Sequence, residues 1–187
     1  MPVVVNLSGY PGIGKATVGR LVAAGLHARF IPNHVVMAPA FALFNVGSPD
    51  WWSLTEIVRC STVLSAMSIC EDTNLVFTGV VVDGQTPDLR HLEQLSILAR
   101  HGGNSGIFAV TLTADEATRK TRLTDPAREY PKLTDWKVGQ LLPYRYDLAT
   151  DEFYESVGAT HLVVNTTRLS APESAQIILD AVAEWLA

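Results

Sequence analysis

The sequence predicts an α/β fold with a parallel sheet at its centre. Five short apolar runs of strand length alternate with segments that have the 3.6-residue periodicity of amphipathic helices. A glycine-rich turn directly follows the first apolar run, as expected where a buried strand passes into a helix. With 187 residues and 48% hydrophobic composition, the chain suits a single domain, residues 1–187, with a substantial core.

The first predicted strand, Val3–Leu7, leads into the glycine-rich turn and then into a helix that begins at Lys15. The spacing Gly9-x-x-x-x-Gly14-Lys15 is typical of a phosphate-binding loop, in which backbone N–H groups and a helix N-terminus surround a phosphate and the lysine reaches its outer oxygens. A dinucleotide-binding turn would need a glycine where Thr17 stands. The predicted nucleotide contacts are therefore Gly9, Pro11, Gly12, Ile13, Gly14, Lys15, Ala16 and Thr17.

Ala16 departs from the full phosphate-loop motif, which places Ser or Thr after the lysine to bind Mg²⁺. The nearest hydroxyl belongs to Thr17, one residue later. We expect Mg²⁺ to be held by nucleotide oxygens, by water and by Thr17. The alternative is a loop that binds nucleotide but has lost efficient catalysis.

Composition excludes several classes of function. A formal net charge of −5 argues against a nucleic-acid surface, which normally needs an excess of Lys and Arg. The N-terminus has no basic region or cleavage site, and no apolar run approaches membrane-spanning length, so we expect a cytoplasmic protein without membrane contact. Cys60 and Cys70 lie on one predicted helix, Trp52–Glu71, too far apart to pair, and are expected to be free thiols.

The segment 33–71 is the predicted acceptor side. A short second strand, Ala28–Ile31, carries Asn33 and His34 to the carboxyl edge of the sheet, where open α/β sheets bind ligands. His34 fits a substrate contact and a core histidine equally well. An apolar stretch over residues 38–44 is expected to break at Pro39, and the pair Trp51 and Trp52 is either packing or a ligand platform.

The third apolar run, Leu75–Gly84, predicts a central strand. If it extends that far, Asp83 lies at its end and is a candidate to orient the hydration shell of Mg²⁺. If the strand ends at Thr78 or Gly79, Asp83 is a loop residue. A helix opened by Thr86 and Pro87 then runs to the glycines at 102 and 103.

A basic segment follows the fourth predicted strand, Gly106–Thr113, and a capping box at Thr113–Glu116. Five of the chain's fourteen basic residues lie within 14 positions: Arg119, Lys120, Arg122, Arg128 and Lys132. Such a cluster suits a phosphate-facing lid over about residues 119–135, because phosphoryl transfer needs its charge neutralised; the alternative is a solvated helix face.

The C-terminal part predicts a further helix over Thr134–Leu142 and a last strand over His161–Asn165. A second capping box, Ser170–Glu173, opens a C-terminal helix that should cover the sheet. The segment 144–154 shows little periodicity and receives no assignment.

In this order, the motifs resemble the nucleoside monophosphate kinase and shikimate kinase group of P-loop kinases over nearly the whole chain. They look most like a bacterial family often labelled AAA-type ATPase or shikimate-kinase-like. The motifs are Gly9–Lys15, Asn33-His34, Phe44-x-x-Gly47-Ser48-Pro49, Phe77-Thr78-Gly79, Arg122 with Arg128 and Lys132–Asp135, and Asn165–Thr167 with Ser170.

The resemblance implies a three-layer α/β/α P-loop NTPase fold with a five-stranded parallel sheet in the order 2-3-1-4-5. It also implies that Lys15 and the loop amides hold the β- and γ-phosphates, that Arg122 lies near the nucleotide, and that Arg128 is the lid arginine. Thr167 and Arg168 would edge the adenine pocket. The carboxylate that follows the second strand in shikimate kinase has no counterpart in Pro32-Asn33-His34, so shikimate is not the expected acceptor.

The leading hypothesis is an ATP-dependent kinase that phosphorylates a small molecule, such as a nucleotide, a metabolite or an antibiotic. Its predicted catalytic residues are Lys15, Arg122, Arg128 and Asp83, with Asn33, His34, Trp51 and Trp52 on the acceptor side and Thr17 and Asp83 near Mg²⁺. The alternative is a nucleotide-binding regulator or weak ATPase, which Ala16 favours. A GTP-specific switch would need an Asn-Lys-x-Asp segment, which the sequence lacks. We expect a monomer or a homodimer.

Overall fold

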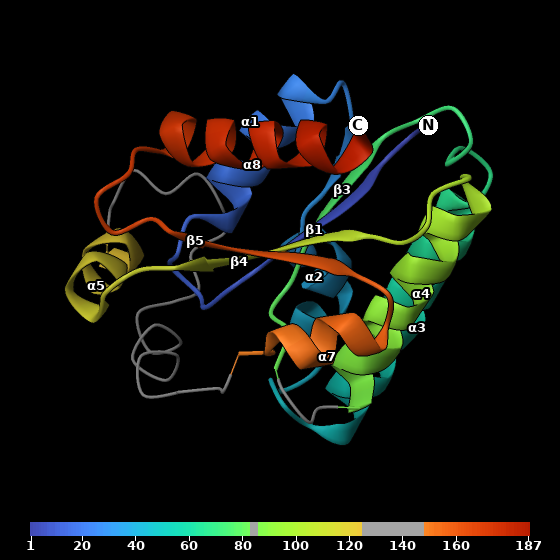
Figure 1. Ribbon diagram of the computed structural model, residues 1–187. Helices are drawn as coiled ribbons and strands as arrows, with labels where there is room; N and C mark the ends of the chain where they lie inside the picture. The colour runs from blue at the N-terminus through green and yellow to red at the C-terminus, as the bar shows by residue number, and fades with distance from the viewer. Residues whose placement is uncertain (83–85, 125–147) are drawn as a thin grey trace.

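A five-stranded, wholly parallel sheet forms the centre of the computed structural model, which describes residues 1–82, 86–124 and 148–187 (Figure 1). The spatial order is β2-β3-β1-β4-β5, which confirms the predicted order. The strands are β1 (Val4–Ser8), β2 (Arg29–Ile31), β3 (Leu75–Thr78), β4 (Phe108–Thr113) and β5 (Thr160–Asn165). The helices are α1 (Lys15–Gly25), α2 (Asn33–Leu43), α3 (Pro49–Ala66), α4 (Thr86–His101), α5 (Glu116–Thr124), α7 (Asp151–Ser156) and α8 (Ala171–Leu186).

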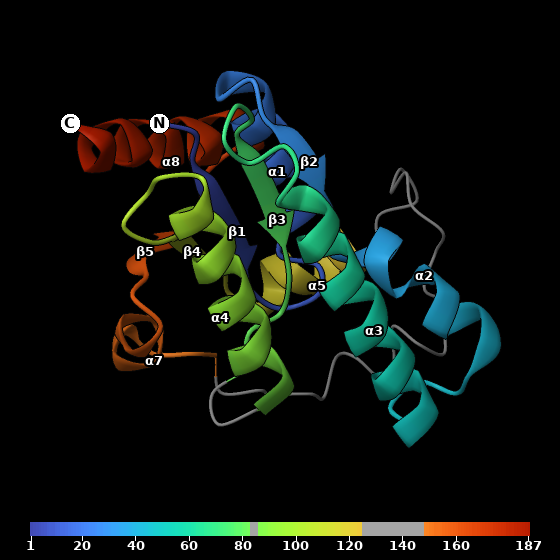
Figure 2. The same ribbon diagram turned by 90° about the vertical axis from the view of Figure 1, so that its right-hand side faces the viewer.

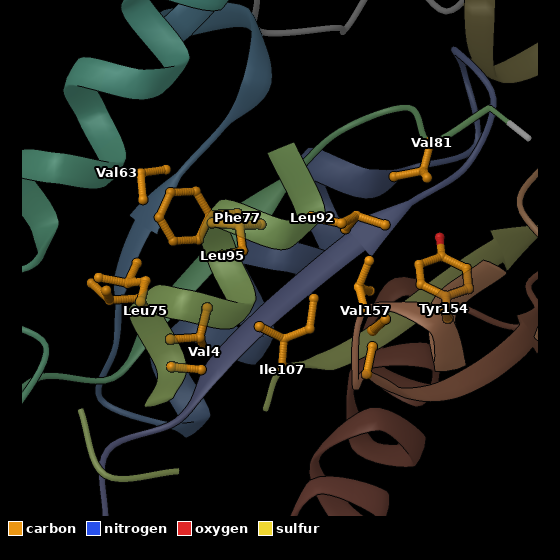
Figure 3. Packing of buried hydrophobic residues seen from close by; sticks show 14 of the residues in the cluster. Val4, Val63, Leu75, Phe77, Val81, Leu92, Leu95, Ile107, Tyr154 and Val157 are labelled. Carbon is orange, nitrogen blue, oxygen red and sulfur yellow. The ribbon is translucent and has the colours of Figure 1, made fainter. Parts of the chain in front are cut away.

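Helices cover both faces of the sheet, as parallel strands require. Figures 1 and 2 show α1 and α8 together on one face and α3, α4 and α7 on the other. Because side chains alternate along a strand, neighbouring residues of β1 enter different cores. Val5 and Leu7 belong to the core under α1 and α8, whereas Val4 packs with Leu75 and Phe77 in the core under α3 and α4 (Figure 3).

The parallel register brings the carboxyl ends of the strands to one edge of the sheet. β1 pairs with β3 on one side and with β4 on the other, and Leu7 lies opposite Thr78 and Val110. The turn after β1, the start of α2 after β2 and the turn after β3 therefore meet at this edge. Ligands of open α/β sheets bind in this position.

Three predictions about helices need correction. The helix predicted over Trp52–Glu71 spans Pro49–Ala66, so Cys70 lies after it; both cysteines are free, as predicted. Pro39 does not break α2, because its ring lies on the exposed side of the helix, where water can satisfy the freed carbonyl. Thr113 does not cap α5, because it still pairs with Asn165 in the sheet.

Asp115 is the residue that caps α5, since its Oδ1 accepts a hydrogen bond from the backbone N–H of Thr118 at 2.7 Å. The third strand ends at Thr78, which agrees with the shorter of the two predicted endings. Residues 151–154, the end of the segment without a sequence assignment, lie in α7. Asp83, Arg128, Lys132 and the helix predicted over Thr134–Leu142 lie outside the described residues. Of the helices described, none combines the length and the apolar character that crossing a bilayer requires.

The capping box at the start of α8 is confirmed. Ser170 Oγ accepts from the N–H of Glu173, and Glu173 Oε2 accepts from the N–H of Ser170 at 2.8 Å. These hydrogen bonds, first that from the Ser170 hydroxyl and then that from its backbone, lower the pKa of Glu173. A carboxyl with a lowered pKa stabilises the fold above its unfolded pKa and loses this effect as the pH falls through the folded value.

Replacement of Ser170 by Ala is expected to lower the free energy of unfolding by about 1 kcal/mol, the usual cost of removing a helix N-cap. Urea denaturation at neutral pH measures the change. The matched control is Ser65→Ala on the exposed face of α3, where alanine favours the helix and no loss is expected. An equal loss in both variants would contradict the capping role.

Candidate functional site: a phosphate loop and a polar cavity at the carboxyl edge of the sheet

The turn between β1 and α1 leaves the first N–H groups of α1 without a side-chain cap. Its N-cap residue, Gly14, has φ 101° and ψ 10°, a left-handed conformation that favours glycine, and the first turn contains no acidic residue. Helices α3 and α8, by contrast, begin with serine hydroxyls that accept a hydrogen bond from a backbone N–H. The N-terminus of α1 is therefore suited to an external anion.

Lys15 lies over this turn. Its Nζ donates hydrogen bonds to the backbone oxygens of Gly9 at 2.6 Å and of Tyr10 at 3.0 Å. These bonds hold the ammonium group at the mouth of the loop, beside the first turn of α1 that Lys15 itself begins. A positive charge and a helix N-terminus thus act on the same small volume, which suits a phosphate.

Helix α5 packs directly against the loop. A Cβ at Gly12, where φ is 84°, would lie 2.4 Å from the side chain of Leu123 and 3.1 Å from the carbonyl oxygen of Arg119, so no larger residue fits there without a shift. The guanidinium of Arg119 lies 5.1 Å from the centroid of the Tyr10 ring, within the range of a cation–π contact. The start of the predicted lid is therefore fixed to the phosphate loop.

Arg122 joins the phosphate loop to the turn after β5. Its Nη1 donates to the carbonyl oxygen of Ile13 at 3.1 Å and to Thr166 Oγ1 at 2.8 Å, and its Nη2 donates to the carbonyl oxygen of Thr166 at 2.8 Å. Thr166 is buried and in turn donates to the carbonyl oxygen of Thr113. At least three of the five guanidinium N–H groups thus hold backbone and hydroxyl oxygens of the protein.

Arg122→Ala is expected to destabilise the protein by about 1–3 kcal/mol, because the carbonyl groups of Ile13 and Thr166 lose their donor. Nucleotide affinity should fall as well, since Ile13 belongs to the loop. Urea denaturation and titration calorimetry with ATP measure the two effects. Arg122→Lys should restore little of either, because one ammonium cannot reproduce the fork of a guanidinium. If Arg122→Lys fully restored stability and nucleotide affinity, the guanidinium geometry would not matter and only the positive charge would explain the effect.

The residues predicted at the adenine edge also lie beside α5. Thr167 Oγ1 accepts from the backbone N–H of Asp115 at 2.9 Å, and the N–H of Thr167 donates to Asn165 Oδ1 at 3.0 Å. Hydrogen bonds from Thr118 chiefly lower the pKa of Asp115, and the nearby charges of Arg122 and Arg168 add to this effect. The structure thus places Thr167 and Arg168 near the N-terminus of α5, on the side where Arg122 contacts Thr166.

A small polar cavity lies at the same edge of the sheet, between β2 and β3 and the helices α2, α3 and α4. Its volume is about 10 Å³, close to the space for one water molecule. Five of its lining residues are polar and three are apolar: Asn33, Arg59, Thr62, Thr78 and His91, with Ile31, Val36 and Phe77. Asn33 and Thr78 are joined by a hydrogen bond of 3.0 Å from the Asn33 N–H to Thr78 Oγ1.

The other predicted acceptor-side residues occupy different environments. His34 is half-buried, and burial and then the charge of Arg20 lower its pKa. Trp51 is buried and packs edge-on against Phe41, with ring centroids 5.6 Å apart. Trp52 is 41% exposed and stands edge-on to Trp51. Of the four predicted acceptor-side residues, only Asn33 lines the cavity.

Sequence reasoning missed a charged pair beside this cavity, of which Arg59 is a lining residue. Arg59 Nη1 lies 3.3 Å from Asp88 Oδ1, and both side chains are buried. Asp88 Oδ2 also accepts from the N–H of Val82 at 3.2 Å. Burial raises the pKa of Asp88, although Arg59 and the hydrogen bond from Val82 act in the opposite direction. The available signal was a charged residue on the buried face of α3, in helical register with Thr55 and Val63.

A second polar group supports the end of β1. Ser8 Oγ accepts from the N–H of Val81 at 2.9 Å, which holds the turn after β3 against the strand that enters the phosphate loop. Tyr154 of α7 hydrogen bonds with Thr111, and His161 Nε2 lies 2.8 Å from the same Thr111 hydroxyl. The Tyr154 and His161 rings stack at 4.0 Å, which fixes α7 to the sheet (Figure 3 shows Tyr154).

The described residues offer few ligands for a divalent cation. Thr17 is exposed on the first turn of α1, and within residues 1–82, 86–124 and 148–187 no group of three or more His, Cys, Asp or Glu side chains could hold a metal. Mg²⁺ in phosphate-transfer sites commonly takes one or two protein ligands and fills its shell with phosphate oxygens and water. The residues present fit that mode of binding.

Comparison with solved structures places this geometry in a known fold. Shikimate kinase from Acinetobacter baumannii, solved with shikimate, aligns with a TM-score of 0.60 and 21% identity over 98% of this chain and 94% of that one. A sugar kinase from Janibacter sp. HTCC2649 aligns with a TM-score of 0.60 and 14% identity over 100% of this chain and 95% of that one. A gluconokinase from Sinorhizobium meliloti 1021 aligns with a TM-score of 0.55 and 16% identity over 99% of this chain and 95% of that one.

These likenesses define the fold class of the chain, which is an α/β P-loop kinase fold. Within that class, the full-length matches confirm the predicted resemblance to the shikimate kinase-like group at the level of the fold. A scan against protein-family models and a search of curated proteins find no match.

Proposed function

We propose that the protein is an ATP-dependent kinase that transfers the γ-phosphoryl group to a small-molecule acceptor. The observation that carries the proposal is the pairing of two sites at one edge of the sheet. A loop with an uncapped helix N-terminus and Lys15 lies after β1, and a polar cavity lies between β2, β3 and α3. A donor site and an acceptor site on neighbouring strands are what direct phosphoryl transfer requires.

In this proposal, the backbone N–H groups of residues 9–17, Pro11 excepted, and the Nζ of Lys15 hold the phosphates of ATP. Arg119 and Arg122 keep the loop rigid through Tyr10 and Ile13, so that its donors need no reorganisation as charge develops. Thr167 and Arg168 edge the adenine. Mg²⁺, when bound, would neutralise charge on the phosphates, with Thr17 and Asp83 as its candidate protein partners. Arg128 remains the candidate lid arginine.

In this proposal Asn33, which lines the cavity, positions the acceptor hydroxyl. His34, Trp51 and Trp52 remain candidate acceptor contacts. Catalysis by this arrangement is mostly positioning and charge neutralisation, because the transferred group needs little covalent help from the protein. Binding the acceptor against the carboxyl edge also removes water that would otherwise compete for the phosphoryl group.

Ala16 supports a second candidate, a nucleotide-binding regulator or weak ATPase. It leaves the first turn of α1 without the hydroxyl that normally follows the lysine. Such a protein would bind ATP through the same loop but would not respond to an acceptor.

Two measurements test these proposals in order. The first is thermal unfolding with and without ATP and Mg²⁺, because a ligand that binds only the folded state raises the melting temperature. Absence of any ATP-dependent rise would reject both candidates.

The second measurement separates kinase from regulator. ADP release is followed while a panel of sugars, polyols, nucleosides and nucleotides is added. Stimulation by one class, lost in Arg128→Ala, supports the kinase. ATP binding with no stimulation across the panel would favour the regulator.

A further inference from the structure

We propose that the cavity selects an uncharged, hydroxyl-bearing acceptor, such as a neutral sugar or polyol, over an acceptor with a carboxylate or phosphate at the same end. This inference rests on the proposed kinase function, and it names the chemical class of the second substrate. It starts from the charges of Arg59, Asp88 and His91.

The cavity contains a buried cation whose charge is already balanced. Arg59 is 6% exposed and Asp88 is 7% exposed, and their closest side-chain atoms lie 3.3 Å apart. Two buried charges of opposite sign at this distance compensate each other and leave no net charge for a ligand. The carboxylate is also fixed in place by the N–H of Val82.

His91 adds no positive charge. Burial and the neighbouring Arg59 lower its pKa to about 3, although a hydrogen bond with Gln94 acts in the opposite direction, so the imidazole is neutral at physiological pH. Among the described residues that line the cavity, Arg59 is thus the only one with a full charge, and Asp88 balances it. An anionic ligand in the cavity would lie near the carboxylate of Asp88, and no unpaired cation among these lining residues would balance its charge.

Two residues that line the cavity also carry buried polar atoms without a hydrogen-bond partner among the described residues. These atoms are Arg59 Nε and His91 Nδ1. Buried polar atoms of this kind are costly unless a ligand or water satisfies them. Arg59 Nε can only donate, whereas a ring nitrogen of neutral histidine donates or accepts according to its tautomer.

A hydroxyl group matches this set of atoms better than an anion does. It accepts from the Arg59 N–H through its lone pairs and can donate or accept toward the histidine, and it fits a space of about 10 Å³. A carboxylate only accepts, is larger, and brings a second negative charge toward Asp88. When like charges are brought together in a desolvated site, the binding affinity falls by at least about tenfold.

The first test uses acetate as the anionic probe and ethylene glycol as the neutral one, with ADP present to fill the phosphate loop. The Nε–H signal of Arg59 in the ¹H–¹⁵N spectrum is identified by its loss in Arg59→Gln. In the wild type, it should shift with ethylene glycol and not with acetate. In Asp88→Asn, which frees the charge of Arg59, the affinity for acetate at this signal should rise at least about tenfold.

Two variants keep the test specific. Asp72→Asn removes the same charge from an exposed turn and should leave the Arg59 signal unresponsive to acetate. In the double variant Arg59→Gln/Asp88→Asn the cavity is neutral again. Acetate should therefore raise the melting temperature of this variant no more than that of the wild type. Acetate binding at Arg59 in the wild type, or an unchanged response in Asp88→Asn, would overturn the inference.

The second test compares matched acceptors in the ADP-release assay: glucose with glucuronate, and methyl shikimate with shikimate. The wild type should favour the neutral member of a pair at least about tenfold in kcat/KM, and Asp88→Asn should narrow that ratio. Preference for the charged member overturns the inference while leaving the kinase proposal intact. Failure of ATP to raise the melting temperature rejects the kinase proposal itself.

Discussion

Lys15→Ala is expected to lower acceptor-stimulated ADP release by about 100- to 1,000-fold, the range found when one preorganised donor to developing charge is removed. The carbonyl oxygens of Gly9 and Tyr10 hold Nζ over the loop, so its position is set before ATP arrives. Alanine removes the charge and this fixed geometry but keeps a good helix former at the start of α1. The measurement is kcat and KM for ATP in the coupled assay.

The control for Lys15 is Arg90→Ala on the exposed side of α4, which also removes one positive charge. It should leave kcat within about twofold, since an exposed charge is screened by solvent. Lys15→Arg should recover little, because a guanidinium is larger and cannot make the same two contacts in this turn. Equal losses of activity in Lys15→Ala and Arg90→Ala would mean that only the net charge of the protein matters.

The strand, glycine turn and helix around Gly9–Lys15 could be predicted from sequence because this structure is local. The residues from Gly9 to Thr17 are contiguous, and the glycine spacing, the apolar strand before it and the helical period after it all indicate the same structure. The strand order followed from the resemblance, and the capping box at Ser170 from its own four residues. Local agreement between signals made these predictions reliable.

The cavity is not local, and sequence reasoning predicted fewer of its residues. The cavity joins residues of β2, α2, α3, β3 and α4, whose separation along the chain hides their proximity. The predictions selected polar residues next to strand ends, and of these Asn33 lines the cavity. They passed over Arg59 and His91, which stand within long amphipathic helices where charged side chains normally face solvent.

The predicted strand from Leu75 to Gly84 shows another limit. Hydrophobicity continues through Val80, Val81 and Val82, yet the strand ends at Thr78. The reason is tertiary: Ser8 Oγ and Asp88 Oδ2 accept the N–H groups of Val81 and Val82, and so draw the backbone away from the sheet ladder. A run of apolar residues alone cannot indicate where such competition for backbone hydrogen bonds begins.

Arg59→Gln is expected to lower the free energy of unfolding by about 3–5 kcal/mol, because it leaves the carboxylate of Asp88 buried without its cation. Asp88→Asn should also destabilise the protein, whereas the double variant should lose less than the sum of the two single losses. Urea denaturation of the four proteins gives this coupling energy. The exposed pair of Arg90 and Glu56, 3.8 Å apart, is the control, and Arg90→Gln should cost no more than about 1 kcal/mol.

The pH dependence of the loss in Arg59→Gln distinguishes a buried charge from a packing defect. Burial already raises the pKa of Asp88 above its ordinary value of 3.8, and removal of Arg59 removes an effect that lowers it. A carboxyl whose folded pKa is raised favours the folded state when protonated, and this advantage disappears as the pH rises through the folded pKa. The stability difference between Arg59→Gln and the wild type should therefore grow from about pH 4 toward neutrality. A loss independent of pH would instead identify the missing contacts of the arginine side chain as its cause.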